Sequence, residues 1–196
     1  MDFSSINPVV LIAALMVAAT PILLAAIGEL VVEKAGVLNL GVEGMMITGA
    51  VVGFAVAVMT RNPYAGMLAA MAGGAAMALI FGILTQLLKA NQVASGLALT
   101  LFGLGFSALL GQGYVGVVPP RTARVDFGVL SEIPVLGPIL FRHDPMVYVS
   151  IMIVAAVWYW LTYTRSGRIL RAVGENHEAA HALGYAAYLF SGLGVF

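Results

Sequence analysis

The sequence predicts an all-α protein, a polytopic transmembrane helix bundle. Hydrophobic residues make up 61% of the chain and charged residues only 9%, against about 25% charged residues in an ordinary soluble domain. A small soluble domain leaves much of its surface in contact with water, so it could not bury this much apolar surface. Several stretches without Asp, Glu, Lys or Arg also have the length that a helix needs to cross a bilayer.

The charge-free stretches predict the spans in chain order, because a helix needs about 20 mostly apolar residues to cross the hydrocarbon core. Five stretches predict five spans, and they are residues 3–28, 44–60, 62–88, 90–120 and 145–164. A further stretch, residues 182–196, predicts the start of a sixth span. The N-terminus has no basic region, so the first stretch is expected to be retained and not cleaved as a signal. We expect one transmembrane domain over residues 1–196, truncated within its sixth span.

The orientation of the bundle follows from the Lys and Arg residues of its loops, which favour the cytoplasmic side. Arg165, Arg168 and Arg171 directly follow the fifth predicted span. The loop at residues 165–184 is therefore expected in the cytoplasm. Alternation along the chain then places the loop at residues 119–145 and the N-terminus outside.

Composition also excludes several classes of function. The chain has no cysteine, which rules out disulfides, iron–sulfur clusters, thiolate zinc sites and cysteine nucleophiles. Its formal net charge is zero, so no basic surface for nucleic acid is expected. Neither of its lysines, Lys34 and Lys89, follows a glycine, so the chain lacks the phosphate-binding pattern G-x-x-x-x-G-K-[ST].

Small and polar residues mark the predicted helix contacts. Gly49 and Gly53 form a G-x-x-x-G pattern, which lets two helix backbones approach closely in lipid. The stretch 90–120 is rich in glycine and in Asn, Gln, Ser and Thr. It is interpreted either as a helix whose polar residues bind neighbouring helices or as a broken helix that lines a cavity.

The segment at residues 28–44 lies between the first two predicted spans and combines Glu29, Glu33, Lys34 and Glu43 with four glycines. It is interpreted as a solvated connection, part of which dips into the membrane. Ionisable groups held within a membrane are usually functional. One alternative function is therefore an ion-coupled secondary carrier in which Glu33, Lys34 and Glu43 form a charge relay.

A second alternative comes from His177, Glu178 and His181, which match the zinc-protease pattern H-E-x-x-H. On a helix, two imidazoles at i and i+4 share a face and can bind one Zn²⁺, with the Glu as general base. A catalytic zinc site needs three protein ligands. The residues that follow His181 include no His, Asp, Glu or Cys, so this hypothesis lacks its third ligand.

Residues 165–184, RSGRILRAVGENHEAAHALG, resemble the cytoplasmic coupling loop of ABC-importer permeases. Gly174 is expected to end one helical stretch, and Asn176 can cap the next by accepting a backbone N–H. Small alanines keep one face of that helix slim, so that it can seat in a groove of a partner. The residues expected to contact an ATPase are Gly174, Glu175, Asn176, Ala179, Ala180 and Gly184.

Two further segments extend the resemblance. Residues 33–46, EKAGVLNLGVEGMM, closely resemble the signature of permeases for nucleosides and simple sugars, within the wider branched-chain amino acid permease family. Residues 130–141, LSEIPVLGPILF, resemble an external stretch of the nucleoside branch. Members of this family are longer than this chain, so the C-terminal part of the family fold is expected to be missing.

The resemblance implies a function, a location and a set of partners. The chain is expected to be a non-enzymatic permease subunit, without catalytic residues, cofactor or metal, in a bacterial-type plasma (inner) membrane. Its implied partners are a cytoplasmic ATP-binding subunit, a second permease subunit, an extracytoplasmic substrate-binding (lipo)protein and the lipid bilayer, with no nucleic acid. ATP binding by the partner would then drive an alternating-access cycle.

Four polar residues are candidates for the substrate pathway, and they are Asn39, Glu43, Gln92 and Ser95. Uncharged sugars and nucleosides need amide and hydroxyl groups on an otherwise apolar wall. The alternative is that these side chains only join helices to one another.

Overall fold

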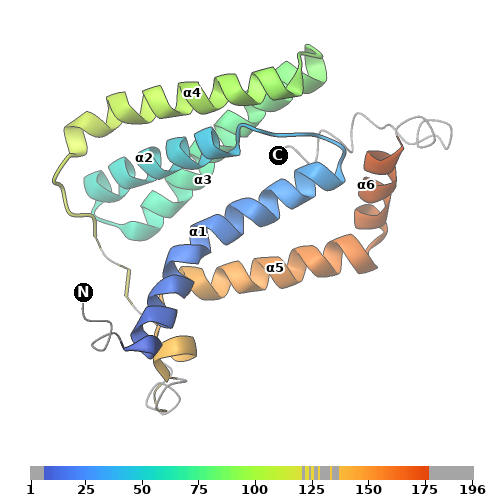
Figure 1. The fold of residues 1–196 in the computed structure, drawn as a ribbon. Coiled ribbons are helices and arrows are strands. Elements are labelled where there is room, and N and C mark those ends of the chain that lie inside the picture. The colour runs from blue at the N-terminus through green and yellow to red at the C-terminus, as the bar shows by residue number, and fades with distance from the viewer. Residues whose placement is uncertain are drawn as a thin grey trace. The chain divides into compact units, whose positions relative to one another are not determined.

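The computed structural model describes residues 7–120 and 137–176, together with Thr122, Ala123, Val125, Gly128 and Ile133. Every regular element in this part of the chain is a helix (Figure 1). In chain order the elements are α1 (Pro8–Lys34), α2 (Val42–Thr60), α3 (Pro63–Gly82), a π-helical turn (Ile83–Leu87), α4 (Gln92–Gly111), a 3₁₀ turn (Gln112–Tyr114), a second π-helical turn (Gly137–Phe141), α5 (Pro145–Tyr163) and α6 (Arg165–Glu175).

The prediction of five spans is confirmed. Five helical segments of the described chain are long and apolar enough to cross a membrane, and they are Pro8–Lys34, Val42–Thr60, Pro63–Leu87, Gln92–Tyr114 and Pro145–Tyr163. Each matches one charge-free stretch of the sequence. The predicted start of a sixth span, residues 182–196, lies outside the described residues.

The end of α1 differs from the prediction. The helix does not stop at Gly28 but continues to Lys34, so Glu29 and Glu33 lie on its last turns and not in a connecting loop. A helix of 27 residues is about 40 Å long, which exceeds the roughly 30 Å hydrocarbon core. The charged end of α1 can therefore reach the polar interface without a break in the helix.

A Schellman motif ends α1. Gly36 has a left-handed φ of 80°, its N–H donates to Glu33 O at 2.9 Å, and Val37 N–H donates to Val32 O at 3.2 Å. Glycine adopts this conformation without the steric cost that a side chain would add. The two valines that flank the motif are both buried in the same apolar cluster, which is the hydrophobic contact that usually accompanies it.

The helix α4 runs without interruption from Gln92 to Gly111, so the interpretation of residues 90–120 as a broken helix is wrong for this segment. Asn91 caps the helix by accepting a hydrogen bond from Ala94 N at 3.0 Å. Asn is a preferred N-cap residue because its side chain satisfies a backbone N–H that lacks a partner in the first turn. Two glycines of α4, Gly96 and Gly103, lie in close contacts with other segments.

The chain divides into two compact units, Met1–Ile27 with Thr122–Trp158 and Gly28–Arg121 with Tyr159–Phe196. In the first unit, the turn Gly137–Phe141 is joined to the start of α5. Tyr148 Oη donates to Leu140 O at 2.8 Å, and a ring nitrogen of His143 lies 2.6 Å from Ile139 O. His143 is almost fully buried, so these contacts fix the residues just before the fifth span.

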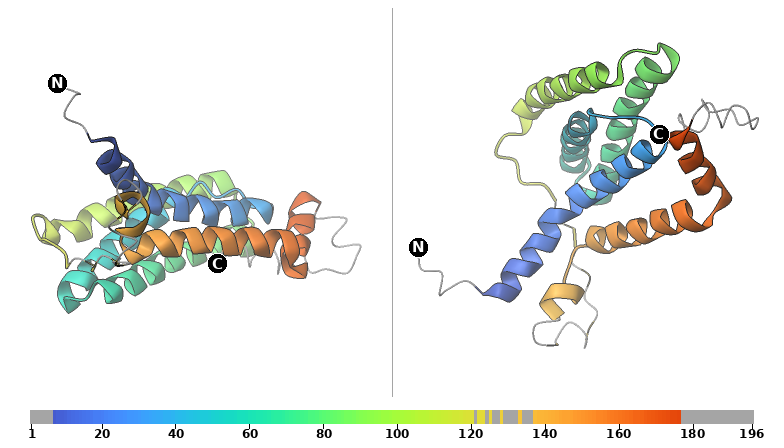
Figure 2. Two further views of the ribbon diagram at one scale, coloured as in Figure 1. Left: turned by 90° about the horizontal axis from the view of Figure 1, so that it is seen from below. Right: turned by 45° about the vertical axis from the view of Figure 1, so that its right-hand side comes forward.

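In the second unit, α2 packs against both α3 and α4, which contact each other much less (Figures 1 and 2). The small residues of the predicted G-x-x-x-G pattern lie in these contacts. A methyl group on Gly53 would lie 2.8 Å from Gly66 O, and one on Gly49 would lie 2.9 Å from Ala70 O. Their lack of a side chain therefore sets the close approach of α2 and α3, as the pattern predicts.

Candidate functional site

The signature segment of the sequence forms a short irregular connection between α1 and α2. Residues 35–41, called the linker below, have no helical structure. Ala35 and Val37 are 0% and 2% exposed, and Val37 belongs to an apolar cluster with Met77 of α3 and Leu99 of α4. The linker is thus a packed part of the second unit and not a solvated loop, which corrects part of the sequence interpretation.

Side chains of α4 hold the linker by hydrogen bonds. Gln92 Oε1 accepts from Leu38 N at 2.8 Å, and Thr100 Oγ1 donates to Leu40 O at 3.0 Å. Between these two residues, Gly96 leaves room for the linker, because a methyl group there would lie 2.9 Å from Leu40 N and 3.0 Å from Gly41 N. One face of α4 therefore satisfies linker groups that no helix or sheet satisfies.

Two further contacts complete the shape of the linker. Glu29 Oε1, on the last turns of α1, accepts from Asn39 N at 3.3 Å. Asn39 Oδ1 accepts from Gly41 N at 2.9 Å, which is the Asx turn typical of Asn. These contacts direct the chain from the end of α1 into the start of α2.

The first residues of the linker contact α6. A methyl group on Gly174 would collide with Lys34 O and would lie 2.8 Å from Gly36 N. Leu170 and Val173, on the same helix, are 2% and 1% exposed. The backbone of α6 therefore lies directly against the end of α1 and the first residues of the linker.

The structure corrects the expected role of Gly174 in the local fold. The helix does not end at this residue but continues to Glu175, and Asn176 donates its N–H to Ala172 O at 3.1 Å. Gly174 is thus a contact residue within α6. Glu175 and Asn176 are exposed at the end of α6, whereas Ala179, Ala180 and Gly184 lie outside the described residues, so the predicted ATPase contact stays a prediction.

The four predicted pathway residues separate into two groups. Asn39, Gln92 and Ser95 gather where the linker meets α4, and Asn39 and Ser95 are 6% and 8% exposed. Glu43 is exposed in the first turn of α2, where a carboxylate is favoured by the helix dipole. Gln92 Oε1 accepts a hydrogen bond from the linker, whereas Asn39 Oδ1 accepts one from Gly41 within the linker itself. Contact of these residues with a substrate stays a prediction.

The residues of the two alternative functions, the ion-coupled carrier and the zinc protease, can be located in part. Glu33 and Lys34 are exposed at the end of α1, and no ion pair joins them to Glu43 or to any other residue that the structure describes. His177, Glu178 and His181 lie outside the described residues. Among the described residues, no group of three His, Cys, Asp or Glu side chains could hold a metal ion.

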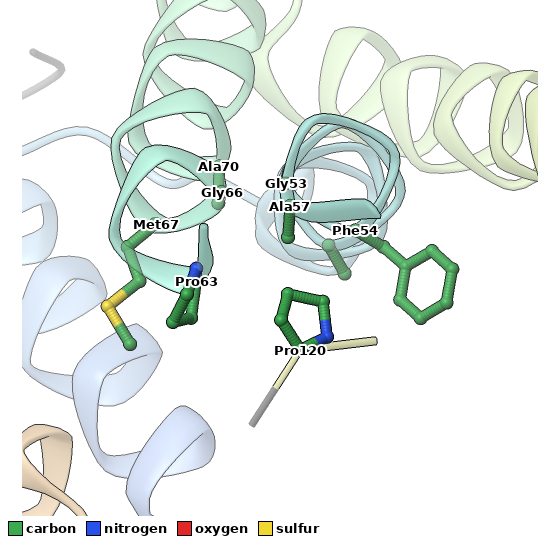
Figure 3. A pocket seen from close by; sticks show the side chains of 9 residues that line it. Gly53, Phe54, Ala57, Pro63, Gly66, Met67, Ala70 and Pro120 are labelled. Carbon is green, nitrogen blue, oxygen red and sulfur yellow. The ribbon is translucent and has the colours of Figure 1, made fainter. Parts of the chain in front are cut away.

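An apolar groove of about 290 Å³ lies between α2 and α3, near Pro120 (Figure 3). Its lining consists of Ala50, Gly53, Phe54, Ala57, Pro63, Gly66, Met67, Ala70 and Pro120. None of these side chains carries a hydrogen-bonding group. The groove therefore does not have the polar groups that would recognise a sugar or a nucleoside.

Comparison with known proteins decides the family. The family described as the branched-chain amino acid transport system permease component matches residues 11–191. The chain belongs to this permease family. The resemblance of the sequence to this family of permeases is thereby confirmed.

Three relatives are named as ABC transporter permeases. TsgC13 of Haloferax volcanii, provisionally named a glucose ABC transporter permease protein, is 40% identical over 91% of this chain and 55% of its own length. The guanosine ABC transporter permease NupQ of Bacillus subtilis is 32% identical over 95% of the chain and 62% of its own length. The nucleoside ABC transporter permease NupC of Lactococcus lactis is 30% identical, with the same coverage.

The permease therefore spans between 55% and 62% of the length of these relatives. No solved structure matches it.

Sequence reasoning missed several residues of this site. Glu29, Gly96 and Thr100 hold the linker, but none of them was a candidate. The Lys34-Ala35-Gly36 run was a usable signal, since a basic residue in the last turn followed by glycine is typical of a helix C-terminus.

Proposed function

We propose that this permease is the membrane subunit of an ATP-driven importer and that its cargo is a simple sugar or a nucleoside. The names of the three relatives support this proposal, since they refer to glucose, to guanosine and to nucleosides, respectively. We further propose that a separate cytoplasmic ATPase drives the transport step through residues 174–184.

The observation that carries the proposal is the continuous series of contacts from α6 through the linker to α4. Gly174 lies against the backbone at Lys34 and Gly36, and Gln92 and Thr100 hold the linker at Leu38 and Leu40. A displacement of α6 by a partner would therefore push on the backbone of the linker. The linker would in turn pass the displacement to the first three turns of α4.

We propose that such a movement changes the binding of the cargo at the start of α4. Gln92 and Ser95 lie in the first turns of α4, which the linker contacts at Leu38 and Leu40, and they provide amide and hydroxyl groups within an apolar bundle. Uncharged sugars and nucleosides are recognised by a few such groups on an apolar wall. A change in the spacing of the linker and α4 would alter how these groups are presented.

The orientation of the importer is proposed from its loop arginines, and its other subunits are proposed from the family to which the chain belongs. Residues 165–184 face the cytoplasm, and the N-terminus and residues 119–145 lie outside. A second permease subunit completes the translocation path, and an extracytoplasmic binding protein delivers the cargo. The hydrolysis of ATP belongs to the separate subunit, because this chain carries no phosphate-binding loop.

The experiment uses the absence of cysteine, which makes any introduced thiol the sole thiol of the chain. Ala180→Cys and Glu175→Cys are expressed separately in membranes together with a candidate ATPase subunit. Both thiols are expected to react with a membrane-impermeant reagent only from the cytoplasmic side. The Ala180→Cys thiol is expected to cross-link to the ATPase to a degree that changes when ATP is added.

Arg61→Cys is the matched control, because Arg61 is exposed at the end of α2 that is proposed to face outside. Its thiol is expected to react only from the external side and to form no cross-link. Labelling of Ala180→Cys from outside only would contradict the orientation. Cytoplasmic labelling without any cross-link to the cognate ATPase would contradict the coupling role of residues 174–184.

A further inference from the structure

The helix α6 carries a basic surface that the proposed transport cycle does not use. Arg165, Arg168 and Arg171 are all exposed, and their spacing of three residues places them on one side of the helix. This set is called the arginine face below. The opposite side of α6 is buried at Leu170 and Val173. None of the three arginines forms an ion pair with any residue that the structure describes.

The arginine face directly follows an aromatic helix end. Trp158, Tyr159 and Tyr163, near the C-terminus of α5, are 58%, 59% and 55% exposed. Exposed Trp and Tyr side chains gather where a span meets the lipid headgroups, because their rings have both an apolar body and a polar group. The last turns of α5 therefore have the composition of a span end at the headgroups, and α6 begins two residues after Tyr163.

Close contacts hold the first turn of α6 on this aromatic end. Trp160 Nε1 donates to Ser166 Oγ at 2.9 Å, and Thr164 Oγ1 accepts from Gly167 N at 3.1 Å. A methyl group on Gly167 would collide with Trp160 O and would lie 2.7 Å from Leu161 Cα. The start of α6 thus has little freedom to move away from the end of the span.

The side chain of Arg168 turns back toward the span. Its Nη1 atom donates to Tyr163 O at 3.4 Å, so the guanidinium lies beside the last residue of α5. A long basic side chain that reaches back in this way keeps its charge at the depth of the lipid headgroups. This direction favours a partner that lies at the membrane surface.

We propose that the arginine face binds the phosphate groups of anionic phospholipids in the leaflet that surrounds α6. Guanidinium groups donate paired hydrogen bonds that match the oxygens of a phosphate. A cluster of basic residues next to a membrane-spanning helix attracts anionic lipid. An acidic protein surface is the competing partner, and the position of Arg168 beside Tyr163 favours the lipid.

The chain has two tryptophans, Trp158 and Trp160, and Trp160 allows a direct test because it contacts Ser166 of α6. The change Trp158→Phe leaves Trp160, which contacts Ser166 of α6, as the sole tryptophan. The full chain is placed in phosphatidylcholine nanodiscs that contain a small, equal fraction of either brominated phosphatidylglycerol or brominated phosphatidylcholine. We expect the anionic lipid to quench Trp160 at least about twofold more strongly, because each basic residue near the surface attracts anionic lipid.

Salt gives a second expected result. At about 1 M salt the screening length falls to about 3 Å, so the excess quenching by phosphatidylglycerol should shrink strongly. Equal quenching by the two lipids at low salt would overturn the proposal, and the arginine face would then be left to an acidic protein surface.

Substitutions separate the arginine face from a general effect of net charge. Replacement of Arg165, Arg168 and Arg171 by Gln is expected to remove the excess quenching, whereas replacement of all three by Lys should retain most of it. The matched control is Arg61→Gln combined with Arg142→Gln, since both residues are exposed outside α6, and it should retain the excess. Full excess quenching in the triple Gln variant would overturn the proposal. The test needs no ATPase and no transport, so its result is independent of the proposed importer function.

Discussion

Two regions of the second unit bring chain segments together through glycine, but they satisfy the backbone in different ways. Where α2 meets α3 and α4, helix packs on helix at Gly53 and Gly66 and at Gly44 and Gly103. The backbone groups of these helices already bond within their own helix, so close packing is enough to join them in lipid. Nothing polar has to cross these contacts.

The linker approaches α4 equally closely at Gly96, but the backbone of the linker lacks the hydrogen bonds that a helix forms within itself. Side chains supply them instead, since Gln92 bonds to Leu38, Thr100 to Leu40 and Glu29 to Asn39. Irregular backbone is tolerated near a membrane only where the protein satisfies its polar groups. The comparison shows why polar side chains of α1 and α4 gather around one short segment, whereas the contacts of α2 with α3 and α4 are almost purely apolar.

The largest effect is expected from Gly103→Ala, at the contact between α4 and α2. The added methyl group would lie 2.5 Å from Gly44 O and 2.7 Å from Gly44 Cα, and backbone atoms cannot move aside as a flexible side chain can. We expect the free energy of unfolding to fall by about 2 kcal/mol, as for other overpacked sites, measured by denaturant unfolding in micelles. Gly105→Ala is the control, because nothing lies within 4 Å of that position and alanine favours the helix by up to about 1 kcal/mol. Equal effects of the two changes would refute the packing argument.

The next largest effect is expected from Gly174→Ala, which tests the contact between α6 and the linker. The methyl group would collide with Lys34 O, so α6 should lift from the end of α1. Ala35→Cys, a position with 0% exposure, serves as the reporter. We expect its thiol to be labelled about tenfold faster in the Gly174→Ala background, because local opening becomes more frequent. Ala172→Ser, at an exposed position of the same helix, should leave the rate unchanged, and an unchanged rate in both backgrounds would contradict the docking of α6.

A smaller effect is expected from Gln92→Met, which removes the acceptor for Leu38 N–H but keeps a side chain of similar length. Hydrogen exchange of the Leu38 amide should become about fivefold faster, because a hydrogen bond of this kind contributes about 1 kcal/mol. Gln92→Glu retains an acceptor oxygen and should preserve the slow exchange. Slow exchange in the Gln92→Met variant would mean that another group holds the linker at this point.

The smallest effect is expected from Thr100→Val, which removes one hydroxyl and keeps the shape of the side chain. Loss of the hydrogen bond to Leu40 O should lower the free energy of unfolding by about 0.6 kcal/mol, the usual size of a hydrogen bond between membrane helices. Thr60→Val is the control, because Thr60 Oγ1 donates to Val56 O within its own helix. A loss of several kcal/mol from Thr100→Val would show that the linker depends on this single contact far more than the comparison implies.

The spans could be predicted from the sequence because lipid demands long apolar stretches, and each of the first five charge-free stretches corresponds to one described span. The predicted end of α1 was wrong because the first charged residue, Glu29, was taken to end the helix. Glu and Lys are in fact good helix formers. The run Lys34-Ala35-Gly36 carries the correct signal. The continuous course of α4 was one of two interpretations that the sequence left open, because its glycines could equally mark breaks or, as at Gly96 and Gly103, contact points.

The contacts of the site could not be predicted from one sequence. Gln92 lies 54 residues from Leu38, and Thr100 lies 60 residues from Leu40, so no local pattern relates these pairs. The same holds for Gly174 and Lys34, whose contact depends on how α6 packs. The polar residues Asn39, Gln92 and Ser95 stay predicted pathway residues, because their types alone do not separate a role in binding a solute from a role in holding the linker.

The length of α2 has a consequence for the membrane in which the bundle resides. With 19 residues it measures about 28 Å, and the chain leaves the helix at once, through Gly41 at one end and through Arg61 in a left-handed conformation at the other. Packing against α3 and α4 limits how far α2 can tilt to match a thicker bilayer. In such a bilayer, Glu43 and Arg61 would be drawn toward hydrocarbon unless the lipid thins around them. Among the described membrane-spanning segments that lie wholly in this unit, α2 is the shortest and most enclosed, and it thereby limits the bilayer thickness to which the permease is suited.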